Sequence, residues 1–226
     1  CIFVIAFHIL KLNIMIKILK KFLPGLFFYK LLSYYDFVKT LNRAFKRRIK
    51  IKKQFGLWTI SFPIKNKKPL KLICRSKKEL KRISRFGLNK NDIVWKWLHW
   101  LEDAETIYDI GSGSGFEGLL AGHLHDCKVC FVEPYTPSIE TILKSVHLQN
   151  GNNTATWEII HAGCSNNESY SRLSMHKPPE AGETLNSFGN AELNYKDGGK
   201  TNRSHVVSQQ WVKGISIDSL VFKYNL

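Results

Sequence analysis

Acidic residues are scarce in the first 90 positions of this 226-residue chain, which contain only Asp36 and Glu79 against 24 Lys and Arg. Residues 91–226 carry 10 Lys and Arg against 16 Asp and Glu, so the two parts differ in the sign of their net charge. This asymmetry is typical of a basic arm attached to a nearly neutral domain, and it indicates an anionic surface as a partner of the arm.

Cysteine is also scarce, because the chain has only five, and an odd number argues against a disulfide framework. Cys127 and Cys130 form a C-x-x-C pair, but no second pair completes a zinc site. We therefore expect both thiols to be buried structural groups. His123 and His125 lack partners at ligand spacing, so we expect solvated histidines at a helix end. The sequence predicts no metal site.

Long uncharged apolar runs are missing as well. Residues 1–10 are apolar, but lysines interrupt the chain from Lys11 onward, whereas a spanning helix needs about 20 mostly uncharged residues. The small-residue cleavage site of a secretory signal is also missing. We expect a cytoplasmic protein. Residues 15–35 alternate apolar clusters with lysines. This pattern fits either helices packed on the catalytic domain or on a dimer partner, or interfacial helices in peripheral contact with a membrane.

Residues 43–53 contain seven Lys and Arg. Basic runs bind nucleic acid, but the interleaved aromatic residues and recognised motifs that would support this are not present, so nucleic acid is not the expected partner. We expect a solvated or membrane-facing helix here. Residues 58–62 and 70–74 then predict a hairpin turned at 65–68, and a polar helix is expected over 77–86.

The most informative stretch is Thr106–Gly115, which reads Thr-Ile-Tyr-Asp-Ile-Gly-Ser-Gly-Ser-Gly. Its first half is β-branched or aromatic and predicts a buried strand, and apolar residues at helical spacing follow the glycines. The glycines have no Cβ atom and can adopt positive φ, and unpaired amides at a helix start attract anions. A strand, a glycine turn and a helix therefore predict a nucleotide-type cofactor site, with a purely structural turn as the alternative.

A carboxylate stands at the end of the next predicted strand, because Val129–Val132 leads directly into Glu133-Pro134, 24 positions after Asp109. In doubly wound sheets an acid about 20 residues after the glycine turn lies at the tip of the neighbouring strand and accepts hydrogen bonds from ribose hydroxyls. Each such bond to a charged acceptor contributes about 1.5–3 kcal/mol. The sequence thus predicts that Glu133 binds ribose.

Two classes of cofactor fit the glycines. Residues 113–118 (Gly-Ser-Gly-Phe-Glu-Gly) match the GxGxxG dinucleotide pattern, which would indicate an oxidoreductase that uses NAD or FAD. However, that match starts three residues after the predicted strand end, and Asp109 would repel a pyrophosphate. A cationic ligand that carries an ammonium and a sulfonium suits Asp109 better.

Five segments together resemble a known family. They are Asp109–Gly115, Val132–Pro134, and residues 142–151, 161–165 and 215–220. The first resembles the DxGxGxG motif of class I S-adenosylmethionine-dependent methyltransferases, and Glu133 resembles their ribose-binding acid. The order of all five is similar to that of the FkbM-type methyltransferases, over about residues 80–226. The resemblance implies a Rossmann-like, doubly wound, mostly parallel α/β sheet and S-adenosyl-L-methionine as cofactor.

The resemblance also implies roles for individual residues. The cofactor-binding residues would be Asp109, Gly111, Ser112, Gly113, Gly115, Glu133, Pro134, Ala162 and Gly163. Asp109 would orient the amino end directly or through water, the glycines would shape the methionyl pocket, and Ala162-Gly163 would border the adenine. FkbM-type enzymes methylate hydroxyl groups of sugars, glycolipids or other natural products. A general base would help such an acceptor, but His161 and His176 are candidates by residue type alone, so the catalytic residues are unknown.

Three features depart from the family pattern. Family members carry a Lys-Ile-Asp-Val-Glu-Gly-like segment soon after the point where this chain stops, which implies a C-terminally truncated domain. Ser145 stands where the family often has Asn. The chain starts at Cys1 and its first methionine is Met15, so residues 1–14 are treated as a candidate non-native segment.

These patterns divide the chain into three parts. Residues 1–54 are a basic and apolar helical extension, 55–104 a cap hairpin with linking helices in which Trp95 and Trp100 are expected in the core or at a domain contact, and 105–226 the methyltransferase domain. Alternating strands and helices predict a parallel sheet with right-handed crossovers. Residues 165–203 predict a long loop or lid. Residues 206–212 and 215–220 predict a final hairpin. A non-catalytic membrane-binding or nucleic-acid-binding protein remains the third alternative.

Overall fold

The computed structural model describes most of the chain after residue 24. The described residues are 25–54, 56–64, 66–85, 93–149, 155–166, 168–175, 187–188, 194–197, 200–203 and 208–223. The segment 1–14, residues 15–24 of the predicted helix pair at 15–35, and His176 therefore lie outside the described residues.

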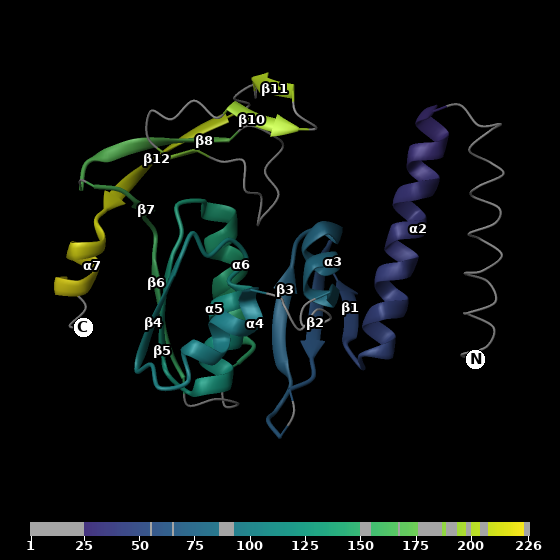
Figure 1. Ribbon diagram of the computed structural model, residues 1–226, viewed down its shortest axis with the longest axis horizontal. Helices are drawn as coiled ribbons and strands as arrows, with labels where there is room; N and C mark the ends of the chain where they lie inside the picture. The colour runs from purple at the N-terminus through teal and green to yellow at the C-terminus, as the bar shows by residue number, and fades with distance from the viewer. Residues whose placement is uncertain are drawn as a thin grey trace.

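A parallel three-stranded sheet forms the centre of the fold (Figure 1). Its strands are β4 (Thr106–Ile110), β5 (Lys128–Val132) and β6 (Thr156–Ile160), in that order. Helix α5 (Phe116–His125) connects β4 to β5, and α6 (Thr136–His147) connects β5 to β6. The predicted alternation of strands and helices and the parallel pairing are confirmed, so the carboxyl ends of the three strands share one edge.

The side chains of this sheet alternate between two covered faces. Ile107, Val129 and Phe131 belong to the main core on the side of α5 and α6. Tyr108, Val132 and Ile160 pack with Leu220 of helix α7 (Ile217–Lys223) on the opposite side. Helices therefore cover both faces, as Figure 1 shows, and the chain is a mixed α/β protein.

A second sheet packs on the far side of α5 and α6. It is antiparallel, with order β1-β2-β3, and consists of β1 (Lys50–Gln54), β2 (Leu57–Phe62) and β3 (Leu70–Cys74). Helices α2 (Gly25–Lys46) and α3 (Lys77–Arg85) pack against each other beside it. The predicted hairpin of β2 and β3 and the helix over 77–86 are confirmed.

The single helix predicted over residues 43–53 is wrong in its second half. Helix α2 ends at Lys46, and Arg48 takes a positive φ of 58° that turns the chain back. Residues 50–54 then pair antiparallel with β2, with Ile51 opposite Ile60. The strand β1 is difficult to recognise in the sequence because it is rich in lysine and only Ile51 packs against the core.

Side chains of α6 and of the turn that follows it bind the outer edge of β3. Ser145 Oγ accepts a hydrogen bond from the backbone nitrogen of Ile73 at 2.9 Å and donates to Thr141 O at 2.8 Å. Gln149 Nε2 donates to the backbone oxygen of Lys71. Ser145 is fully buried, so α6 closes this edge with polar side chains in place of a neighbouring strand.

Ser145→Ala is expected to lower the free energy of unfolding by about 1–3 kcal/mol, because it leaves the buried Ile73 amide without its acceptor. Urea denaturation of the wild type and the variant measures this change. Lys144→Ala, on the exposed side of the same helix, is the matched control and should change stability by less than about 0.5 kcal/mol. Equal effects of the two substitutions would remove this role for Ser145.

Two predictions about aromatic and histidine side chains are wrong. Trp100, in helix α4 (Ile93–Trp100), is 77% exposed rather than part of the core, and the side chain of Trp95 is outside the described residues. His123 is only 2% exposed, and its Nε2 lies 2.7 Å from the backbone oxygen of Lys68. The hairpin turn covers this end of α5, which is why His123 is buried.

A four-stranded sheet lies at the carboxyl edge of the parallel sheet, with order β7-β12-β8-β9. Its strands are β7 (Gly163–Cys164), β8 (Tyr170–Met175), β9 (Ser187–Phe188) and β12 (Ser208–Ile215), and a separate pair is formed by β10 (Asn194–Asp197) and β11 (Lys200–Arg203). The loop predicted over 165–203 is thus wrong where these strands lie. The pairing is non-local, and its polar, exposed strands lack a clear apolar alternation.

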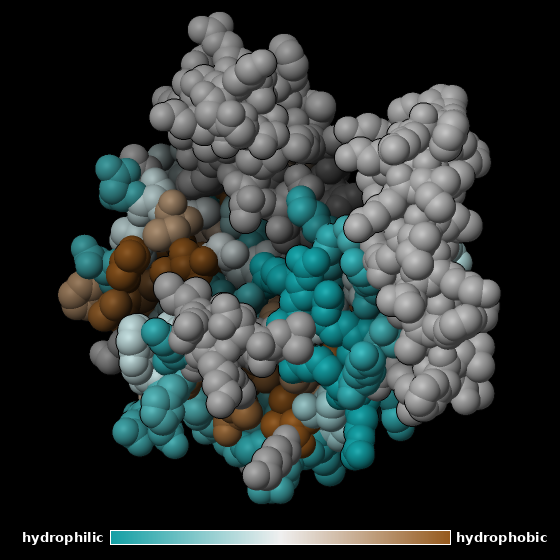
Figure 2. Space-filling model, turned by 45° about the vertical axis from the view of Figure 1, so that its right-hand side comes forward, coloured by the Kyte–Doolittle hydropathy of each residue, from teal (hydrophilic) through white to brown (hydrophobic). Residues whose placement is uncertain are grey.

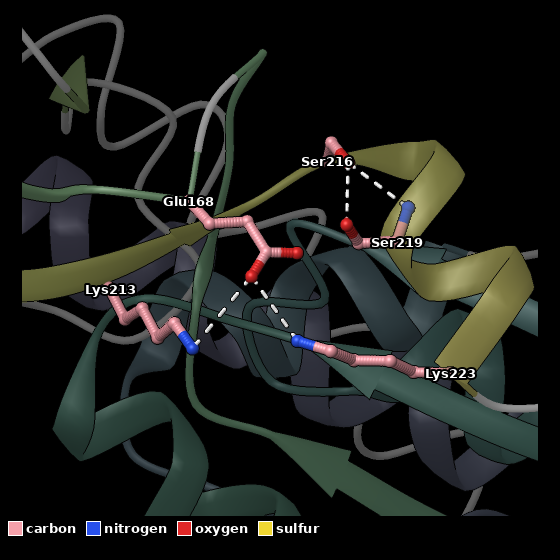
Figure 3. Close-up of polar contacts among 5 residues, drawn as sticks. All are labelled: Glu168, Lys213, Ser216, Ser219 and Lys223. Atoms are coloured by element: carbon pink, nitrogen blue, oxygen red, sulfur yellow. Dashed lines mark hydrogen bonds and ion pairs between the residues drawn. The ribbon is translucent and has the colours of Figure 1, made fainter.

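The prediction of a final hairpin from residues 206–212 and 215–220 is also wrong, because β12 continues through Lys213-Gly214 and a helix follows it. Ser216 Oγ accepts a hydrogen bond from the backbone nitrogen of Ser219 at 3.0 Å, which caps the start of α7. Glu168 joins this region to β12, since its Oε2 accepts from Lys223 Nζ at 3.2 Å and lies 4.0 Å from Lys213 Nζ (Figure 3). Ser219 and Lys223 hold the pKa of Glu168 below its usual value.

Hydrophobic side chains at the surface form separate groups beside wider hydrophilic areas (Figure 2). The helices in the described part of the chain are all too short or too polar to span a membrane.

Candidate functional site

The turn between β4 and α5 has an unusual backbone. Gly111, Gly113 and Gly115 have φ angles of 73°, 56° and 73°, in the left-handed region that favours glycine. The backbone nitrogen of Gly111 donates to Val132 O at 2.8 Å, and Ser112 Oγ donates to Asp109 O at 2.6 Å. The predicted strand, glycine turn and helix are therefore confirmed, with the turn tied to the ends of both strands.

Glycine is required at positions 111 and 118 for two different reasons. A Cβ atom on Gly111 would meet nothing within 4 Å, so only its backbone conformation selects glycine there. A Cβ atom on Gly118 in α5 would lie 2.5 Å from Phe131 Cε1 and 2.7 Å from Asp109 Oδ2. Gly118 thus allows α5 to approach the strand that carries Asp109.

Gly118→Ala is expected to destabilise the protein by about 1–3 kcal/mol, because a well-packed interior has no room for the added methyl group. Gly111→Ala is the control for backbone strain alone and should cost about 1–2 kcal/mol. Thermal unfolding gives the two stabilities. A Gly118→Ala variant as stable as the wild type would contradict this close packing of α5 on β4 and β5.

Asp109 lies at the end of β4 and points at the start of α5. Its Oδ2 accepts a hydrogen bond from the backbone nitrogen of Gly118 at 3.1 Å. Burial, chiefly, and then the neighbouring charge of Glu117 raise the pKa of Asp109 to about 7, against the opposing effects of the Gly118 hydrogen bond and Arg82. Asp109 is thus a carboxyl group that changes charge near neutral pH and that a nearby cation would hold ionised.

Two charged residues near Asp109, Glu117 and Arg82, were not predicted from the sequence. Glu117, in the first turn of α5, forms a short ion pair with Arg82 of α3. Its position directly after the glycine turn was a signal that could have found it. Arg82 could not be found in this way, because it is 35 positions away and reaches the site only through packing of the second sheet.

Glu133 lies at the end of β5, next to β4. Its carboxylate accepts a hydrogen bond from the backbone nitrogen of Gly113 at 2.7 Å and another from Tyr135 N at 2.8 Å. The residue is 6% exposed, and burial raises the pKa of Glu133 although both hydrogen bonds oppose this shift. Asp109 and Glu133 thus contact the two ends of one segment, residues 113–118.

The remaining predicted site residues lie at the same edge of the sheet. Pro134 O accepts a hydrogen bond from Gln210 Nε2 of β12 and lies 3.0 Å from His161 Nε2. Ala162 is buried, and Gly163 starts β7, where it pairs with Gly214. The structure brings Asp109, the glycines and Glu133 into direct contact, whereas Ala162 and Gly163 follow the third strand.

Part of the four-stranded sheet covers this edge. Leu173 and Met175 of β8 and Val212 of β12 pack on Tyr135, two positions after Glu133. The two strands that contact the edge are β8, which lies within the lid predicted over residues 165–203, and β12, which follows it. Their inner side chains could not be assigned from the sequence because strand pairing decides which face they occupy.

No general base is assigned by this geometry. His161 is exposed, and its Nε2 lies beside a backbone oxygen rather than a catalytic partner. Cys127 and Cys130 are buried free thiols, as expected. In the part of the chain that the structure describes, no three His, Cys, Asp or Glu side chains are grouped so that they could hold a metal ion.

Comparisons with protein-family models, with curated proteins and with solved structures found no match to this chain.

Proposed function

We propose that the chain is an S-adenosylmethionine-dependent methyltransferase that methylates a hydroxyl group of a sugar, glycolipid or other natural product. One observation carries the proposal. A turn with three glycines at positive φ lies between two carboxylates, from Asp109 and Glu133, at the ends of adjacent parallel strands. In open α/β sheets, ligands bind outside the carboxyl ends of the strands. The hydroxyl acceptor comes from the resemblance to FkbM-type enzymes.

The residues at this edge fit the chemical groups of the proposed cofactor. S-adenosylmethionine carries an ammonium, a sulfonium and a ribose diol, and it supplies the reactive methyl group when bound. A carboxyl group with a pKa of about 7 becomes fully charged beside such a cation, so Asp109 would favour the amino end. Gly111, Ser112, Gly113 and Gly115 would border the methionyl part, and Pro134, Ala162 and Gly163 the adenine.

Glu133 retains the capacity to bind ribose although its carboxylate already accepts two hydrogen bonds. An ionised carboxylate has about four acceptor positions, and Gly113 N and Tyr135 N occupy two of them. Two remain for ribose hydroxyls. The backbone bonds would fix the orientation of the carboxylate before the ligand arrives, which reduces the entropy lost on binding.

The proposed reaction needs placement more than covalent help from the protein. Alignment of an acceptor oxygen with a methyl carbon at about 3–3.5 Å can supply about 7–11 kcal/mol of the barrier. The strands β8 and β12, which pack on Tyr135, would confine the acceptor near the cofactor.

Calorimetry with S-adenosylhomocysteine and with NAD tests the proposal against an oxidoreductase. We expect saturable binding of S-adenosylhomocysteine and none of NAD, because the Asp109 carboxyl behind the turn would repel a pyrophosphate. Binding of NAD without S-adenosylhomocysteine would reject the methyltransferase and favour the dinucleotide pattern at 113–118.

A further inference from the structure

One face of the sheet of β1, β2 and β3 carries exposed lysines, although Ile73 of β3 on the same face is buried. The inner face of the sheet carries Ile60, Leu70 and Leu72, which are almost fully buried. The opposite face carries a set of residues that we call the lysine face, namely Lys50, Lys52, Thr59, Ser61 and Lys71. Its three lysines are exposed and its two hydroxyl residues are half-buried.

The register of the strands gives the lysine face a regular pattern. Lys50 is opposite Ser61, and Ser61 is opposite Lys71, so two ammonium groups flank one hydroxyl across three strands. Lys52 is opposite Thr59 in the next row. Among the described residues no acid forms an ion pair with these three lysines, although Lys67, Arg75, Lys81 and Arg82 of the same region are all paired with acids.

Protection of an edge strand explains only part of this pattern. Lysines on an exposed edge such as β1 prevent pairing with another chain. Lys71, however, lies on β3, whose outer edge is already bound by Ser145 of α6 and by Gln149, which follows α6. The arrangement instead resembles a surface for phosphate groups, since a phosphate above Ser61 would contact both neighbouring lysines and a hydroxyl donor.

We propose that the lysine face binds the anionic phospholipid surface of a membrane. Lys46 and Arg48, exposed in the connection from α2 to β1, extend the positive charge along the chain. The face is part of a sheet without a projecting helix to enter a nucleic-acid groove, and it offers no aromatic side chain for base stacking, because Trp58 lies on the opposite face beneath Lys53. Each lysine near such a membrane adds to binding, and salt weakens the attraction.

Co-sedimentation of the full chain with vesicles tests this surface. The probes are mixed phosphatidylserine and phosphatidylcholine vesicles, and phosphatidylcholine vesicles alone. The test variant is K50E/K71E, which reverses the two lysines around Ser61. The matched control is K96E/K144E, which makes the same change in net charge at exposed lysines of α4 and α6. Thermal unfolding of both variants verifies that they are folded.

We expect K50E/K71E to bind the anionic vesicles at least about tenfold more weakly than the wild type, and K96E/K144E to change binding by less than about threefold. High salt should release the wild-type protein, and neutral vesicles should not bind it. If both variants lose the same amount of vesicle binding, net charge alone explains the effect, and the proposal is overturned. Unchanged vesicle binding of K50E/K71E would also overturn the proposal. This holds equally if the substitution instead changes self-association of the protein or its binding to a labelled oligonucleotide.

Discussion

Glu133→Ala is expected to weaken binding of S-adenosylhomocysteine at least tenfold, and by about 100-fold if both ribose hydroxyls lose their acceptor. The backbone amides of Gly113 and Tyr135 hold the carboxylate in place, so its removal takes away an acceptor that is already oriented. Calorimetric titration of the wild type and the variant gives the two dissociation constants.

The same substitution removes the acceptor of the Gly113 and Tyr135 amides, so stability has to be measured beside affinity. Glu133→Gln retains one acceptor oxygen and should fall between the wild type and the alanine variant in both measurements. Glu140→Ala, an exposed acid on α6, controls for the change in net charge and should leave affinity unchanged. A folded Glu133→Ala variant that binds as tightly as the wild type would remove Glu133 from the site.

The parts that could be predicted from the sequence are those whose signals are local. The run from β4 to β6 alternates buried strands with helices, and each strand carries enough apolar residues to be identified alone. The turn could be predicted from Gly111, Gly113 and Gly115, because few residues other than glycine adopt positive φ angles. Asp109 and Glu133 could be placed together because parallel strands align their carboxyl ends.

The features that could not be predicted from the sequence depend on contacts between distant segments. His123 is buried because the turn of the hairpin reaches it from 55 positions away. Strand β1 is nearly all polar, so only its pairing with β2 identifies it. Ser145 looked like a departure from a family pattern, yet it binds the Ile73 amide 72 positions away. None of these contacts leaves a periodic signal in the residues that make it.

Ligand affinity is expected to depend on pH through Asp109. A cation held near this carboxyl lowers its pKa from about 7, so binding releases a proton when the pH is below that value. The dissociation constant should therefore be constant above pH 7 and rise by up to about tenfold per pH unit below it. The effect should be larger for S-adenosylmethionine, which has two cationic groups, than for S-adenosylhomocysteine, which has one. Titrations in buffers of different ionisation enthalpy count the protons released.

The variant Asp109→Asn separates the effect of Asp109 ionisation on ligand binding from the titration of other groups. Its side-chain oxygen can still accept the hydrogen bond from Gly118 N, but the side chain carries no charge. In the ligand-free wild type, a folded pKa above the unfolded value stabilises the protein at low pH, and this contribution is lost as the pH rises from about 4 to about 7. The variant should therefore be more stable than the wild type at pH 8, by on the order of 1–4 kcal/mol, yet bind the cofactor more weakly and without the slope below pH 7. Glu79, whose pKa burial also raises to about 7, acts equally in both proteins and cancels in the comparison. Opposite changes in stability and affinity are expected of a half-buried carboxyl group that binds a cationic ligand. A variant that retains the wild-type pH dependence would show that another group binds the cation.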